Sequence, residues 1–317
     1  MLATRGRRVV LGEREFHRWV RAHLPAGHAG RLPIGDDAAA LSVGRHRTVL
    51  LSSDALIENV HFLRTSPPER IGAATTAVNL SDIAAKGGRP AAVLIDLLVP
   101  TDTAGAWARS VLRGAECMAA RFGCHVLGGD TKPSETRSVV GVSVGWAGPG
   151  HIPTRDGARP GDLVVTTGVV GFGGAHRSNI TASLDVVPRV AEGEFLGPVA
   201  HSMTDTSDGI AEAAHLIAEA SHSRVILVAE ALPLHPRLGR SGRPTDGQLE
   251  AAFYGGDYEL FATLPPERLR STQSTLRRRG GGVTVIGRVE PGRGAWLERG
   301  GHRGPLPFAG WQPFARR

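Results

Sequence analysis

The chain has 317 residues, of which 41% are hydrophobic and 21% charged, a composition typical of globular proteins and a length that predicts two domains. The absence of an 18-residue apolar run and of a basic-then-apolar leader argues against membrane insertion and secretion. Cys117 and Cys124, the two cysteines, are too few for a disulfide framework or a zinc quartet, so we expect a cytoplasmic protein.

A net charge of +7 favours anionic partners, but nucleic-acid binding is not the function that we expect. Lys86 and Lys132 are the only lysines, so the excess is arginine spread through the chain. Aromatic residues make up only 5% of the chain, too few to form base-stacking surfaces. We interpret the three arginines at 277–279, which precede three glycines, as the solvated end of a helix.

The first sixty residues place three carboxylates in turns and at a strand end. Residues 13–23 predict an amphipathic helix from the spacing of their apolar side chains. A glycine-led turn, Gly35-Asp36-Asp37, follows it. Residues 48–51 predict a strand that delivers Ser52-Ser53-Asp54 to its C-terminal end, a usual place for binding residues in α/β folds.

A helix is predicted from Pro67 and Pro68, which are tolerated in a first turn, to the glycines at 87 and 88. Asp82 lies eleven residues after Ile71, about three turns, and therefore on the same apolar stripe. A carboxylate on an apolar face is costly unless it is paired or bound to a metal. Asp82 is therefore the principal metal-ligand candidate.

The rest of the first half predicts a four-stranded α+β domain. Residues 91–99 form a nearly continuous apolar strand, and the apolar residues of 107–122 have helical spacing. A strand at 124–127 runs into Gly128-Gly129-Asp130-Thr131, and 137–146 alternate as a strand does. The proline- and glycine-rich stretch 148–162 predicts a boundary between domains 1–148 and 149–317.

The second half begins with a strand at 163–167, followed by four residues, Gly171-Phe172-Gly173-Gly174. Their spacing matches no dinucleotide or Walker fingerprint, which favours tight turns over a phosphate loop. Residues 178–203 show no convincing period. Thr206 or Ser207 is predicted to cap a helix, with Asp205 and Asp208 at its positive end.

Further strands are predicted at 224–228, 260–262 and 283–289, and a helix at 269–279. The chain closes on an aromatic tail that contains Trp311. Docking of the tail onto the core is the ordinary interpretation of such a residue, and a ligand contact is the alternative.

The aspartates are more informative as a set than one by one. Each one alone is explained by a turn or a helix cap. If they converge, however, two like charges ~4 Å apart repel by roughly 4 kcal/mol at an effective dielectric of ~20. A cation is then needed, and hard oxygen ligands of this kind suit Mg²⁺, which also takes waters and substrate phosphates.

These motifs, in this order, resemble those of the thiamine-monophosphate kinase family, within a superfamily that includes aminoimidazole ribonucleotide synthetase and selenophosphate synthetase. The resemblance runs from Gly35 to Phe314. The matching segments are Gly35-Asp36-Asp37, Ser53-Asp54 with His61-Phe62, Asn79-Leu80-Ser81-Asp82, Gly128-Gly129-Asp130-Thr131, Arg155 with Arg159-Pro160-Gly161-Asp162, Ser207-Asp208-Gly209, Asp257-Tyr258-Glu259-Leu260 and Gly310-Trp311.

The resemblance implies an N-terminal α/β domain whose four-stranded sheet pairs with its twin into a barrel across a homodimer, and a C-terminal α/β domain. It also implies a cleft that holds ATP and several Mg²⁺ ions. The metal ligands it implies are Asp37, Ser52, Ser53, Asp54, Asp82, Asp130, Asp205 and Asp208, of which Asp37, Asp54, Asp82 and Asp130 are assigned to catalysis. Gly129, Asp130, Arg155 and Ser207 are implied to contact ATP, and His61 and Trp311 the phosphorylated acceptor.

One departure from the family pattern concerns the acceptor. The family reads Gly-Gly-Glu-Asp-Tyr-Glu-Leu, with the glutamate facing the thiamine end, whereas this chain has Gly256 at that position. The leading hypothesis is an ATP- and Mg²⁺-dependent kinase that converts thiamine monophosphate to thiamine diphosphate. A relative that uses the same ATP site on another acceptor, as a kinase or a ligase, is the second. A non-catalytic nucleic-acid-binding or scaffold protein is the third, and the intact set of aspartates argues against it.

Overall fold

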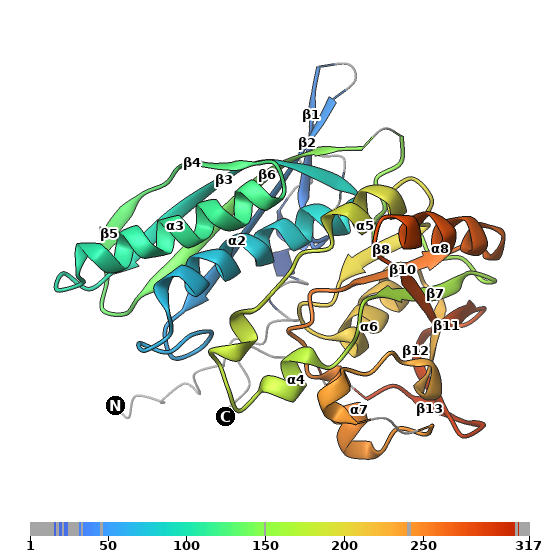
Figure 1. Ribbon diagram of the computed structural model, residues 1–317. Coiled ribbons are helices and arrows are strands. Elements are labelled where there is room, and N and C mark those ends of the chain that lie inside the picture. The colour runs from blue at the N-terminus through green and yellow to red at the C-terminus, as the bar shows by residue number, and fades with distance from the viewer. Residues whose placement is uncertain are drawn as a thin grey trace, which may run out of the picture.

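The computed structural model describes residues 16, 19, 20, 22–24, 32, 34–44, 47–148, 150–239, 242–307 and 310. Most of the helix predicted at 13–23, and the whole aromatic tail with Trp311, lie outside these residues. The described part folds into two sheets with helices packed on them (Figure 1). None of its helices is both long and apolar enough to cross a membrane.

The first sheet has six strands, not the four predicted. Its order is β1 (Ala39–Val43), β2 (Arg47–Ile57), β6 (Ser138–Ala147), β3 (Gly88–Val99) and β4 (His125–Gly128), with β5 (Thr131–Pro133) also paired to β3. The sequence pattern missed β1 as a separate strand, and β5 is only three residues long. The β2–β6 and β6–β3 pairs are antiparallel, so Asp54, Gly141 and Ile95 lie side by side.

Helices α2 (Pro68–Ala85) and α3 (Gly105–Arg121) lie along one face of this sheet (Figure 1). They approach closely at glycines: a Cβ on Gly72 would lie 1.9 Å from the Val111 carbonyl oxygen, and one on Gly114 equally close to that of Glu69. Helix α2 is buried on nearly all sides and not along a single stripe, because α5 and β8 of the second half cover what the sheet and α3 leave open.

The second sheet has seven strands. Their order is β13 (His302–Pro305), β12 (Gly294–Arg299), β9 (Arg224–Val228), β11 (Val283–Glu290), β7 (Leu163–Thr167), β10 (Leu260–Leu264) and β8 (Ser202–Asp205). Helices α6 (Ile210–Ala220) and α7 (Asp246–Phe253) pack on one face, and α5 (Val190–Leu196) and α8 (Leu269–Arg278) contribute to the other. Side chains along β10 point alternately to the two faces of the sheet. Leu260 and Ala262 belong to one hydrophobic core and Phe261 to the other.

Short elements connect these strands. They are α4 (Phe172–His176), η1 (Ala182–Leu184), η2 (Ala229–Ala231), η3 (Pro236–Leu238) and η4 (Pro266–Arg268). The segment 178–203, for which the sequence gave no period, contains η1, α5 and the start of β8. The predicted cap of α6 is wrong: Gly209, with φ of 101°, occupies that position without a side-chain hydrogen bond.

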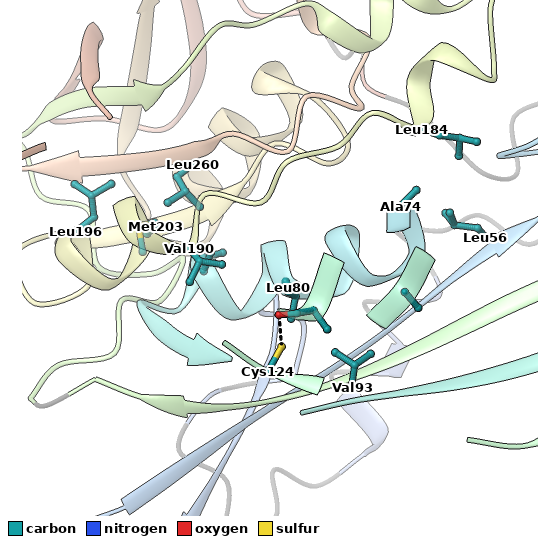
Figure 2. Close-up of a cluster of buried hydrophobic side chains, with 14 of the residues drawn as sticks. Leu56, Ala74, Leu80, Val93, Cys124, Leu184, Val190, Leu196, Met203 and Leu260 are labelled. Atoms are coloured by element: carbon teal, nitrogen blue, oxygen red, sulfur yellow. Dashed lines mark hydrogen bonds between the residues drawn. The ribbon is translucent and has the colours of Figure 1, made fainter. Parts of the chain in front are cut away.

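One hydrophobic core joins the two halves of the chain. Leu80 on α2 belongs to the same cluster as Val190, Met203 and Leu260 from the second half, as Figure 2 shows. The Cys124 thiol lies in this cluster and donates to the carbonyl oxygen of Ala119 over 3.4 Å. This continuous packing fixes the strand ends of the second sheet against the C-terminal part of α2.

Candidate active site

Three carboxylates from distant parts of the chain converge between the two sheets. Oxygens of Asp37, Asp82 and Asp205 all lie within 4.8 Å of one another. Asp37 comes from the turn before β1, Asp82 from the C-terminal half of α2, and Asp205 from the end of β8. The structure therefore brings together three of the aspartates that the sequence singled out.

Asn79 positions the fourth carboxylate, Asp54, against this group. The Asn79 side-chain oxygen accepts from the backbone N–H of Asp54 over 3.0 Å, and its amide nitrogen donates to the Thr75 carbonyl oxygen over 2.8 Å. Space for this amide exists because residue 141 is glycine, whose Cβ would lie 2.2 Å from the amide nitrogen. Helix α2 thereby holds the middle of β2, and with it Asp54, at the cluster.

Hydroxyl groups bind the carboxylates from several sides. The Ser52 hydroxyl donates to Asp82, and the Ser81 hydroxyl donates to Asp205 over 2.7 Å. Ser207 donates to the other oxygen of Asp205, over 2.8 Å from its hydroxyl. These neutral donors orient the carboxylates without cancelling their charge.

Within the described residues, cationic side chains contact the cluster on one side, at Asp36 and Asp37. The Lys86 ammonium, with no exposed side-chain area, contacts Asp36 at 2.5 Å and Asp37 at 2.8 Å. Arg155 donates to Asp37 and, over 2.7 Å, to the Gly35 carbonyl oxygen. Burial alone would raise the pKa of Asp37, but the charges of Arg155 and Lys86 hold that pKa well below its usual range.

The remaining carboxylates have the opposite electrostatics. Burial and the charges of Asp54 and Asp205 raise the pKa of Asp82 well above its usual range. Burial, and after it the charge of Asp37, raises the pKa of Asp205 to about 6. Burial also raises the pKa of Asp54. At neutral pH these groups repel one another and attract a cation from outside the protein.

This donor set fits Mg²⁺. The ligand atoms available are carboxylate and hydroxyl oxygens, the hard donors that Mg²⁺ prefers. A buried group of carboxylates with raised pKa values is stabilised by a divalent cation more than by any change that the side chains can make alone. Asp37, Asp82 and Asp205 form the candidate ligand group for such an ion, and Asp54 lies beside Asp82.

The predicted ATP contact Gly129-Asp130 lies elsewhere on the same sheet. Strands β6 and β3 separate Asp130 from Asp54, about 14 Å at a strand spacing of about 4.8 Å. The Asp130 side chain is exposed and pairs with Lys132 at 3.0 Å. Gly129 is required by packing, since a Cβ there would lie 1.8 Å from the Ile95 carbonyl oxygen. This structure does not bring Asp130 into the carboxylate cluster.

Other predicted site residues border the cluster. Ser53 follows Ser52 on β2 and is exposed, and Asp208 is half-buried in the turn before α6. His61 lies in the turn after β2, where its Nδ1 accepts from the backbone N–H of Ile57 over 3.1 Å. In the neutral imidazole the proton is therefore on Nε2, which leaves that nitrogen as the donor.

The loop that contains Gly256 packs on the turn before α6. The Gly256 N–H donates to the Ser207 carbonyl oxygen over 2.7 Å. The Asp257 carboxylate accepts from the backbone N–H groups of Gly171 and Gly173, at 2.8 and 3.2 Å. Glu259 is held by Arg189 and by the Thr167 hydroxyl. Both acidic neighbours of Gly256 are therefore engaged in holding the fold.

Sequence reasoning missed four residues of the site. Lys86, Ser81 and Thr204 bond to its carboxylates, and burial together with the charges of the cluster raises the pKa of Tyr258 well above its usual range. Lys86 gave a signal as one of two lysines, one helical turn after Asp82, and Ser81 and Tyr258 stand inside motifs quoted for the family resemblance. Their interactions with the carboxylates, and that of Thr204, become visible only when α2, β8 and β10 meet.

Comparisons with known proteins indicate one family. Residues 35–148 match the family model described as AIR synthase related protein, N-terminal domain. The chain is 34% identical over 303 residues to a thiamine-monophosphate kinase of Synechococcus elongatus, covering 88% of this chain and 89% of the relative. It is 30% identical over 301 residues to that of Escherichia coli K12, with 90% and 92% covered.

Solved structures show the same fold. The structure of AaThiL complexed with AMPPCP and TMP superposes with a TM-score of 0.82 at 29% identity, over 96% of this chain and 97% of that one. The hydrogenase maturation protein HypE in complex with ATP superposes with a TM-score of 0.69 at 20% identity, over 87% and 89%. At that identity the second likeness concerns the fold alone.

Proposed function

The chain belongs to the thiamine-monophosphate kinase family, and we propose on that premise that it transfers the γ-phosphoryl group of ATP to thiamine monophosphate, giving thiamine diphosphate and ADP. The observation that carries the proposal is the convergence of Asp37, Asp82 and Asp205, with Asp54 held beside Asp82; the cations of the described residues contact this group at Asp37. AaThiL, whose fold this chain shares, was solved with AMPPCP and TMP bound.

The chemistry requires charge neutralisation more than a general base. An oxygen of the acceptor phosphate attacks the γ-phosphorus, the bond from that phosphorus to the bridging oxygen breaks, and the electron pair leaves with ADP. Both reactants are anions. When bound to the aspartates, Mg²⁺ supplies the positive charge that lets them approach.

The protein's own residues provide position and orientation. Ser52, Ser81 and Ser207 fix the carboxylate oxygens by hydrogen bonds, and Arg155 and Lys86 fix Asp37. We propose that Arg155 also contacts the ATP phosphates through its remaining N–H groups, since its side chain is 21% exposed. Gly129, Asp130, Asp208 and Ser53 stay assigned to ATP and metal binding as a proposal, with His61 and Trp311 at the acceptor.

A homodimer is the second part of the proposal. Alternate side chains of the first sheet point away from α2 and α3, and several of these are large and apolar. Leu94, Leu127 and Trp146 are 37%, 70% and 39% exposed, and they lie on three neighbouring strands (Figure 1). Such a face is a liability that pairing with the same face of a second copy removes.

The connection between the two sheets supports a division of the chain at residue 148. Strand β6 ends at Ala147 and β7 begins at Leu163, with no helix or strand described between them. We propose residues 1–148 as the domain for ATP, metal and dimer contacts, and 149–317 as the C-terminal domain that closes the site.

Two measurements test the proposal. Turnover of ATP with and without thiamine monophosphate, with the product identified by mass, should show thiamine diphosphate only when Mg²⁺ is present. Activity on a different acceptor, with none on thiamine monophosphate, would contradict the proposed substrate. Light scattering at micromolar concentration should show twice 33.4 kDa, and a clean monomer would contradict the dimer.

A further inference from the structure

A cavity of about 260 Å³ lies away from the carboxylate cluster, where the C-terminal ends of α3 and α8 meet the segment before α5. Part of its wall is apolar, formed by Phe122, Val187 and Leu276 among others. Three arginines line the rest: Arg121, Arg189 and Arg279. No residue of the carboxylate cluster lines it.

Cationic side chains outnumber acidic ones in the lining of the cavity. Within the described part of the chain, neither Arg121 nor Arg279 makes an ion pair with a carboxylate. Arg189 is paired with Glu259, yet its side chain keeps 30% of its area exposed. Glu192 is the one acidic residue in the lining. The guanidinium groups come from three separate elements, so their arrangement depends on the tertiary fold and not on one basic run.

We propose that this cavity binds a small phosphate monoester that bears an apolar or ring-shaped group. Guanidinium groups bind phosphate through paired N–H donors, and the apolar wall suits a hydrocarbon or ring beside that phosphate. The volume is below the ~300–1,000 Å³ of pockets for drug-sized ligands, which favours a small metabolite over a peptide segment.

Hydrogen bonds connect Arg189, in the cavity lining, to the residue that follows Asp205. Arg189 donates to both oxygens of Glu259, at 2.7 and 2.5 Å. The backbone of Glu259 is bonded twice to Thr206, at 2.9 and 3.0 Å, and Thr206 follows Asp205. A bound anion that competes with Glu259 for the guanidinium of Arg189 therefore perturbs the segment that holds Asp205. This regulatory step rests on the proposed kinase, whereas the binding step does not.

Binding is tested by calorimetric titration with phenyl phosphate, without nucleotide or Mg²⁺. The full chain should bind the probe, and the double variant R121Q/R279Q should bind at least about tenfold more weakly, because two charged hydrogen-bond donors are lost. The matched control R277Q/R278Q also removes two positive charges, at the end of α8 beside Arg279, but leaves the cavity lining intact. It should bind as the wild type does.

Three results would overturn the site: no heat in the wild type, equal weakening in both double variants, or displacement of the probe by AMPPCP. Regulation is tested by the Mg²⁺ concentration that half-activates the kinase. Phenyl phosphate should shift it at least about threefold in the wild type and not in R121Q/R279Q. An equal shift in that variant would show that the probe acts at the acceptor site. It would contradict a regulatory role for the cavity. A chain that binds the probe but lacks kinase activity would contradict the proposed function alone.

Discussion

The carboxylates of the site fall into two regions that the protein treats differently. Asp36 and Asp37 lie against Lys86 and Arg155, and the pKa of Asp37 is held below its usual range. On the other side, the donors to Asp82 and Asp205 within the described residues are hydroxyl groups and the backbone N–H of Ser207, all of them neutral, and the pKa values of both aspartates are raised. The charges of the first region are paired within the fold, whereas the second region is the one that, on the proposed function, takes a cation from solution.

This difference distinguishes carboxylates that stabilise the fold from carboxylates proposed to bind metal for catalysis. Neutralised carboxylates hold the turn at Gly35, the end of α2 and the start of the second sheet together. Carboxylates left without protein cations destabilise the metal-free fold and therefore bind metal more tightly, since metal binding removes their repulsion. Three experiments test the distinction, and a fourth concerns the acceptor side of the site.

The largest effect is expected at Lys86. Replacing it with methionine leaves Asp36 and Asp37 buried without their ammonium partner, which should lower the free energy of unfolding by about 3–5 kcal/mol. Lys132→Met is the matched control, because that lysine pairs at the surface with exposed Asp130, and should cost only a small fraction of this. Urea unfolding measures both, and equal losses would show that Lys86 is not the organising cation.

Asp82→Asn should lower kcat on the order of 10³-fold, about 4 kcal/mol of transition-state stabilisation, because the amide keeps the shape but not the charge that holds metal. Metal-free stability should rise, since repulsion with Asp54 and Asp205 is removed. Added Mg²⁺-ATP should stabilise the wild type and not the variant. Asp185→Asn, an exposed aspartate paired with Arg70, is the control. Normal turnover in Asp82→Asn would remove Asp82 from the site.

The metal-free protein should lose stability as pH rises from about 4 to 6. Folding raises the pKa of Asp205 from 3.8 to about 6, so the native state binds more protons than the unfolded chain in that window, and stability falls with pH by about 1–3 kcal/mol. The lowered pKa of Asp37 acts in the opposite sense, but below pH 4. Urea midpoints should fall more steeply with pH in EDTA than with Mg²⁺, where the slope that remains comes from Asp257, whose pKa burial raises to about 7. A flat profile in EDTA would contradict the two-region description.

The smallest effect is expected at Gly256, outside both regions. If the glutamate found there in the family contacts the thiamine moiety, Gly256→Glu should lower the KM for thiamine monophosphate ten- to hundred-fold and leave that for ATP unchanged. Its Cβ would lie 3.4 Å from the Gly173 Cα, so the site has room. The φ of +80° should cost about 1 kcal/mol of stability.

Asp257 and Glu259 are poor substitutes for the missing glutamate. The first is committed to Gly171 and Gly173, and the second to Arg189 and Thr167. A micromolar KM in the wild type that the substitution leaves unchanged would show that no acidic contact is needed at position 256. Steady-state kinetics on both proteins decide it.

The sequence alone determined most of the long helices and strands and singled out the aspartates that converge. Strands with strong apolar runs, such as β7 and β9, were predicted with the bounds that the structure shows, because burial on both faces imposes a continuous pattern. Asp82 was identified because a carboxylate on an apolar helix face needs a partner wherever the helix packs. Eight short motifs in order were enough to indicate the family.

Only the tertiary structure decided which charges meet. No local pattern reveals that Lys86 reaches Asp37 or that Ser81 bonds Asp205, since those partners are 49 and 124 residues apart. The cap at Gly209 was mispredicted for the same reason: the hydroxyl of Ser207 is used by Asp205 and not by the helix. Sequence periodicity reports which side chains are buried, whereas pKa values and metal affinity depend on which buried charges the fold brings together.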